Sequence, residues 1–113
     1  LEKGGPGGSI LFTGATASLR GSARFHNLAV GKFGLRALAQ SMARELGPAG
    51  IHVAHIIIDG QIRSERDGYR ESERGADTVL HPDAIAQNYL QLHRQPRSAW
   101  THELDLRPFS EKF

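Results

Sequence analysis

The apolar residues of this 113-residue chain gather in short runs that are separated by stretches with helical spacing. Residues 9–13 and 51–58 are nearly continuous apolar runs, and the second, IHVAHIII, is rich in β-branched residues. Such a run is typical of an interior parallel strand that is covered on both faces. Residues 99–106 instead alternate apolar and polar positions, as a half-buried strand does. The pattern therefore predicts three strands.

Between these runs, apolar residues recur at steps of three and four, the spacing of one helical face. The first stretch predicts a helix from about residue 25 to residue 46, which Gly47 and Pro48 end. The second predicts a helix that starts at residues 81–83 and stops before Gln95 and Pro96. The apolar face of the first helix consists of Leu35, Leu38, Met42 and Leu46.

The predicted order is strand, helix, strand, helix, strand. Helical crossovers imply parallel strands with right-handed connections, so we expect an α/β fold with a short parallel sheet of three strands and flanking helices. In this interpretation residues 9–106 form one domain. Residues 1–8 are a flexible glycine-rich lead-in, residues 107–113 are a tail, and the charged segment 61–78 is a long solvated loop.

Composition and charge exclude several classes of protein. The net charge of +2 comes from well-mixed acids and bases, without a basic patch interleaved with aromatic residues, which disfavours nucleic-acid binding. The chain has no cysteine, which excludes disulfides and thiolate chemistry and is consistent with a reducing cytoplasm. Its longest apolar run is far too short to span a membrane. We therefore expect a cytoplasmic protein that binds neither nucleic acid nor membranes.

Three segments carry a resemblance to a known family. They are GGSILFTGATAS at the first predicted strand, GKFGLRALAQSMARELGPAGIHVAHI through the first helix and second strand, and DGQI after that strand. They resemble the C-terminal half of short-chain dehydrogenases/reductases, over about residues 8–106. The resemblance implies a partial Rossmann-like, three-layer fold that supplies the fifth, sixth and seventh strands of a seven-stranded sheet. The glycine-rich turn that cradles the cofactor pyrophosphate belongs to the other half.

The resemblance also implies candidate site residues. The family places a catalytic tyrosine four residues before a lysine, and a serine thirteen residues before the tyrosine. Lys32 matches the lysine and would contact the nicotinamide ribose, unless it is simply a polar residue at the helix start. Leu28 and Ala15 occupy the tyrosine and serine positions, and a leucine has no proton to exchange. Ser18 is the candidate replacement for the serine.

A second group of candidates follows the second predicted strand. There the family has Pro-Gly and then an Ile or Val whose backbone holds the cofactor carboxamide. Gly60 and Ile62 fit this pattern, which implies that they contact NAD or NADP, whereas Asp59 departs from it. A metal site is not expected. His52 and His55 lie three apart on one strand and so point to opposite faces, and no H-E-x-x-H motif is present.

Three functions remain open at this point. The first is a truncated or fragmentary short-chain dehydrogenase/reductase-like protein, NAD- or NADP-dependent by ancestry and not catalytically competent alone. The second is a non-catalytic module for dimerisation or ligand binding, and the third is a hydrolase that uses Ser18 or Ser22. Because the strand at residues 9–13 would lack a neighbour, we expect a second copy or a separate N-terminal polypeptide to cover it and the first helix.

Overall fold

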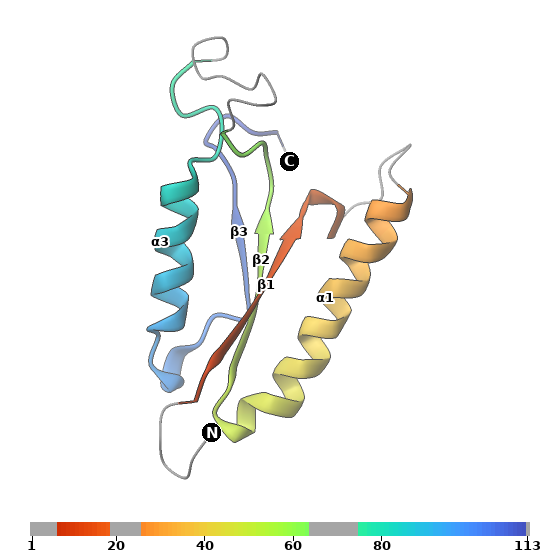
Figure 1. Ribbon diagram of the computed structural model, residues 1–113, viewed down its shortest axis with the longest axis vertical. Helices are drawn as coiled ribbons and strands as arrows, with labels where there is room; N and C mark the ends of the chain where they lie inside the picture. The colour runs from red at the N-terminus through yellow and green to blue at the C-terminus, as the bar shows by residue number, and fades with distance from the viewer. Residues whose placement is uncertain (1–6, 19–25, 64–74, 113) are drawn as a thin grey trace.

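The computed structural model describes residues 7–18, 26–63 and 75–112 (Figure 1). Predictions for residues 1–6, for Ser22, for the start of the first helix at residue 25 and for most of the 61–78 loop lie outside the described residues. Short 3₁₀ turns follow β1, follow α1 and precede β3. The strands and helices are β1 (Ser9–Ala15), α1 (His26–Leu46), β2 (His52–Ile58), α3 (Pro82–His93) and β3 (Glu103–Leu106).

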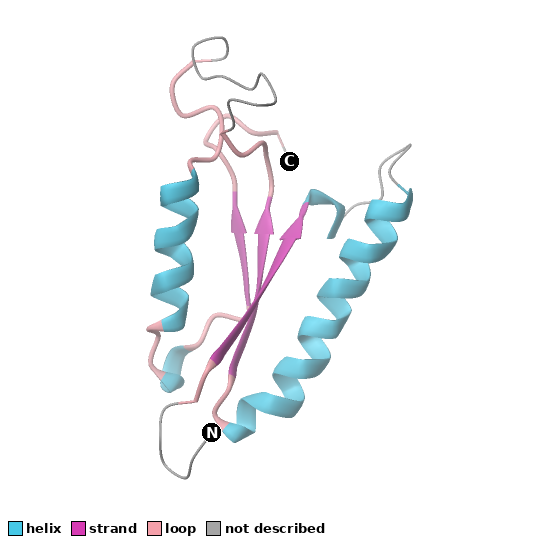
Figure 2. Ribbon diagram, viewed as in Figure 1, coloured by secondary structure: helices cyan, strands magenta, loops and turns pink. Residues whose placement is uncertain are grey.

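The strands form one parallel sheet in the order β1-β2-β3. Ser9 is level with His52 and Ala15 with Ile58, so all seven residues of β1 pair along β2. The shorter β3 pairs with the carboxyl half of β2, from His55 to Ile58. Helices α1 and α3 lie on opposite sides of the sheet, which gives three layers (Figure 2). The α/β fold with a short parallel sheet is therefore confirmed.

The central strand β2 is buried at every one of its residues, as its continuous apolar sequence predicts. Alternate residues face the two helices. Ala54, Ile56 and Ile58 face α3 and form the aliphatic core with Leu80 and Leu92. Partly buried side chains complete this core. They are Leu11, Ile85, Tyr89, Leu104 and Leu106.

The prediction for the third strand was wrong at its start, because β3 begins at Glu103 and not at residue 99. Residues Arg97–Ala99 form a 3₁₀ turn instead. The side chain of Gln95 then holds the next segment, since its Oε1 accepts the N–H of Thr101 at 2.8 Å and its Nε2 donates to Thr101 Oγ1 at 2.9 Å. A backbone N–H held by a side chain is not available to a strand partner, so the apolar alternation at Trp100 is misleading.

The first strand and its loop also differ slightly from the prediction. β1 continues past residue 13 to Ala15, because its pairing with β2 runs to Ile58. A 3₁₀ turn, Thr16–Ser18, follows it directly. No helix among the described residues is long and apolar enough to cross a bilayer.

Candidate functional site

The carboxyl ends of the three parallel strands lie at one edge of the sheet (Figure 2). Several polar residues come at or just after these strand ends. In open parallel sheets, ligands bind outside this edge. Ala15 ends β1, Asp59 follows β2 and Arg107 follows β3. The strand register places these three positions side by side, since Ala15 is level with Ile58 and Ile58 with Leu106. This edge is the candidate site.

Asp59 connects all three strand ends. Its side chain is only 6% exposed, and its carboxylate accepts hydrogen bonds from the Thr16 hydroxyl and, at 3.3 Å, from Nε of Arg107. Its backbone N–H donates to the carbonyl of Leu106 at 2.8 Å. Arg107 also donates from Nη2 to Asp105 at 2.8 Å. The residue that departs from the family's proline is therefore a buried carboxylate whose charge is balanced by an arginine.

Gly60 continues this edge in a conformation that other residues rarely adopt. Its φ is +148°, and a Cβ placed there would lie 2.8 Å from Cδ of Pro108. A side chain at this position would therefore be strained and would clash. The bare Cα of Gly60 thus makes room for Pro108, which follows β3.

Ile62 lies two residues further along, beside helix α3. It forms a parallel bridge with Leu80, in which the N–H of Leu80 donates to Gln61 and the N–H of Arg63 donates to Leu80, both at 2.7 Å. The N–H and the carbonyl of Ile62 itself take no part in the two hydrogen bonds of this bridge. Its side chain is 40% exposed and lines a cavity of about 390 Å³ together with Tyr89. The structure therefore places Gly60 and Ile62 together at the carboxyl edge.

Lys32 lies on α1, beside the carboxyl half of β1. Its Nζ donates to the carbonyl of Thr13 at 3.3 Å. Leu28 lies one turn earlier on the same helix, in a part of the chain whose side chains the structure does not describe. Ala15, at the serine position, has no side-chain donor. Among the three catalytic positions of the family, only Lys32 thus offers a polar group.

Ser18 is completely buried, unlike a group that meets a substrate. Its Oγ accepts the N–H of Ala15 at 3.1 Å, which closes the turn after β1. A Cβ added to Gly14 would lie 2.6 Å from this Oγ and 2.2 Å from Nε2 of His55. The serine and the histidine therefore pack against the same bare Cα, and only glycine fits between them.

His55 belongs to a network of hydrogen-bonded polar side chains that the sequence analysis did not predict. The ring is fully buried on the α1 side of β2, and its Nδ1 lies 3.1 Å from Oε2 of Glu103 on β3. Arg36 of α1 holds the same carboxylate with two hydrogen bonds, from Nε at 2.8 Å and Nη2 at 2.9 Å. Nε2 of His55 has no partner among the described residues. The sequence did contain a sign of this network, because a histidine inside an apolar strand needs a polar partner.

The charges in this network stabilise one another. The hydrogen bonds from Arg36 hold the pKa of Glu103 below its ordinary value, against the opposing effect of burial, and His55 adds to the lowering. Glu103 in turn raises the pKa of Arg36. Serine, histidine and carboxylate follow one another here as in a hydrolase triad, but no hydrogen bond joins Ser18 to His55, and both are buried. The polar network Arg36–Glu103–His55 attaches α1 to the sheet.

His52, the other histidine of β2, points away from this network, as expected. The ring of His52 stacks on Trp100 with a centroid separation of 4.7 Å, and its Nε2 lies 2.7 Å from the carbonyl of Thr101. Within the described ranges, no three His, Asp or Glu side chains are placed to hold a metal ion.

Comparisons with known proteins agree with this geometry. A crystal structure of a short-chain dehydrogenase from Rhodopseudomonas palustris is 50% identical over 91% of this chain, with a TM-score of 0.69. A serine dehydrogenase in complex with NADP⁺ has a TM-score of 0.77 at 16% identity over 93% of the chain. An NADPH-bound short-chain oxidoreductase from Pseudomonas aeruginosa with an atypical catalytic center has a TM-score of 0.72 at 17% identity over 93%.

The first of these matches carries the assignment, and the two distant ones show the fold alone. The chain belongs to the short-chain dehydrogenase/reductase family. It spans 39% of the length of the first structure and 46% of each of the other two. No protein-family model and no curated sequence matches it.

Gly14→Ala is expected to destabilise the fold by about 1–3 kcal/mol, because the new methyl group overlaps Nε2 of His55 and Oγ of Ser18. Gly34→Ala on α1 is the matched control, since a Cβ there meets nothing within 4 Å and alanine favours helix by about 1 kcal/mol. Urea unfolding followed by circular dichroism measures both. Equal effects of the two substitutions would contradict the packing described for Gly14.

The stability of the protein is expected to fall in acid as Glu103 is protonated. Its pKa is lowered by folding, so the stabilisation is complete above the ordinary glutamate pKa of about 4.3 and is lost as the pH falls through the lower folded value. Glu103→Gln should therefore be less stable at neutral pH and show a flatter pH dependence. Urea midpoints measured from neutral pH to about pH 3 test this. Glu45→Gln, on the exposed side of α1, should leave the slope unchanged.

Proposed function

We propose that this chain supplies the C-terminal part of an NAD(P)-dependent oxidoreductase and binds the nicotinamide end of the cofactor. The observation that carries the proposal is the carboxyl edge, where Lys32, Gly60 and Ile62 follow the order and spacing of the family. Support comes from the 50% identity to a short-chain dehydrogenase. Further support comes from two structures of the same fold, which hold NADP⁺ and NADPH.

The residues present fit such a cofactor at Ile62 and Lys32. The positive φ of Gly60 turns the backbone between β2 and Ile62, and Pro108 occupies the place that a side chain at Gly60 would take. Ile62 has an N–H and a carbonyl that its bridge to Leu80 does not use. Lys32 brings an ammonium group to the end of β1, where it would donate to ribose hydroxyls. When bound, the cofactor supplies the hydride chemistry.

The proton-transfer groups of the family are missing from this edge. Ala15 has no donor, and Leu28 has no ionisable group at the tyrosine position. Asp59 supplies a carboxylate at the strand ends, but Thr16 and Arg107 already hold it. We therefore propose that the chain alone is not catalytically competent. A non-catalytic module for dimerisation or ligand binding is the second candidate, and the same two replacements favour it.

The third candidate, a hydrolase, receives less support. Ser18 is buried and its Oγ accepts a backbone hydrogen bond, so a substrate cannot reach it in this conformation. Ser22 lies outside the described residues. The absence of cysteine from the chain is consistent with a place in the reducing cytoplasm, which we also propose.

We further propose that another polypeptide covers the outer edge of β1 and the outer face of α1. β1 pairs only with β2 among the described strands. On α1, three large apolar side chains are exposed: Val30 at 75%, Leu38 at 49% and Phe33 at 39%. An unpaired strand beside an apolar helix is a surface that proteins normally cover. The occupant is a second copy or the polypeptide that carries the remaining strands.

The cofactor site is tested by reconstitution. The part of the Rhodopseudomonas palustris relative that lies outside the match serves as the N-terminal polypeptide. The isolated chain should not bind NADH or NADPH at millimolar concentration, whereas the reconstituted complex should. Lys32→Ala should weaken binding about tenfold through loss of a charge-assisted hydrogen bond, and Lys112→Ala should not. A complex that forms but binds neither nucleotide would refute the proposal.

The covered surface is tested by sedimentation of the chain. It should run as a dimer or in complex with the N-terminal polypeptide, and Val30→Asp should shift it towards a monomer because a charge would be buried. Leu90→Asp, on the exposed side of α3, is the matched control and should not. A wild-type chain that stays monomeric both alone and in the mixture would show that this surface has neither partner.

A further inference from the structure

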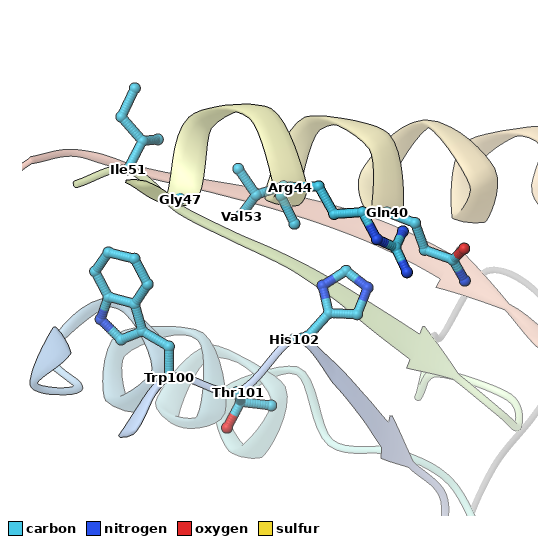
Figure 3. Close-up of a pocket in the computed structure, with 9 residues that line it drawn as sticks. Gln40, Arg44, Gly47, Ile51, Val53, Trp100, Thr101 and His102 are labelled. Carbon is cyan, nitrogen blue, oxygen red and sulfur yellow. The ribbon is translucent and has the colours of Figure 1, made fainter. Parts of the chain in front are cut away.

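A second cavity lies at the opposite end of the sheet from the candidate site. It has a volume of about 250 Å³ and opens between the C-terminal half of α1 and the segment that precedes β3 (Figure 3). The part of that segment that lines the cavity, residues 100–102, lies outside β3, which begins at Glu103. The strand neighbour proposed above would join the sheet at β1, whereas this cavity lies towards β3.

The cavity has an apolar part and a polar part. Ile51, Val53 and the indole of Trp100 form the apolar part. Figure 3 shows the ends of Gln40 and Arg44 on the same side as the ring of His102, with Trp100 at the other end. A pocket with one apolar wall and a few converging polar groups is the usual form of a small-molecule site.

The polar part is cationic. Arg44 is exposed and makes no hydrogen bond or ion pair within the described parts of the chain. None of the residues that line the cavity carries a carboxylate. Glu103, which follows the lining residue His102 in sequence, is already held by Arg36 and His55. Another acid, Glu45, follows Arg44 on the helix and does not line the cavity.

We propose that this cavity binds a small aromatic carboxylate, independently of any cofactor at the other end of the sheet. The carboxylate pairs with the guanidinium of Arg44, whose planar fork matches two carboxylate oxygens. The ring lies against Ile51, Val53 and Trp100, where a flat apolar body gains stacking and excludes water. The volume suits a molecule of about the size of benzoate.

Trp100 provides a direct reporter, since it is the only tryptophan in the sequence. In a two-dimensional ¹H–¹⁵N spectrum, its indole N–H gives one side-chain signal of its own. Titration with benzoate should shift this signal and saturate. Benzamide has the same shape without the charge, and should bind at least about fivefold more weakly because it lacks the charge-assisted bond.

Two arginine variants decide which cavity is occupied, because Trp100 also lines a cavity of about 340 Å³ on its other side, next to Arg97. Arg44→Gln should weaken benzoate binding at least about fivefold, and Arg97→Gln should leave it unchanged. Both arginines are exposed, so both variants should keep the wild-type spectrum. An effect of Arg97→Gln alone, no effect of either variant, or equal binding of benzamide would overturn the proposal.

The titration also separates this inference from the proposed oxidoreductase role. All residues of the cavity come from this chain, so the reconstituted complex should bind benzoate with the same affinity as the chain alone. Benzoate binding without nucleotide binding would leave the cavity assigned and the cofactor site refuted. Nucleotide binding without a saturable benzoate shift would do the reverse.

Discussion

The complete burial of β2 is the constraint on which the rest of the structure depends. A strand that is covered on both faces can hold a polar side chain only if another buried group receives its hydrogen bond. His55 is such a side chain, and Glu103 is its partner. The carboxylate would be costly to bury alone, so Arg36 reaches it from α1. One histidine thus determines which residue of β3 must lie beside it and how α1 is turned.

The same constraint explains the division of the molecule into two chemically different sides. The side that faces α3 holds the aliphatic cluster of Ala54, Ile56, Ile58, Leu80 and Leu92. On the side that faces α1, the polar network Arg36–Glu103–His55 takes the place of apolar side chains, and Gly14 leaves the space that His55 needs. Val53 and Ile57 are buried on this side too, so polar and apolar contacts together hold α1 on the sheet.

Much of the fold could be predicted from the sequence, because it rests on patterns of the backbone and of burial. Continuous apolar runs identified β1 and β2, and Gly47 marked the end of α1. The start of β3 was misjudged because the side chain of Gln95 takes a backbone N–H, which no periodicity reveals. The roles of Lys32, Gly60 and Ile62 stay predictions, and the candidate site was proposed there from the family resemblance. Its polar links were not, because Thr16, Asp59 and Arg107 meet only through the register of three strands.

The position of β2 between two crossover units has a consequence for how this half of the fold forms. The units β1–α1–β2 and β2–α3–β3 each close over a short stretch of chain, and they have β2 in common. Neither can assemble without ordering the strand that the other requires. The two units therefore cannot behave as independent modules, and a single cooperative folding step should order both layers of helices together.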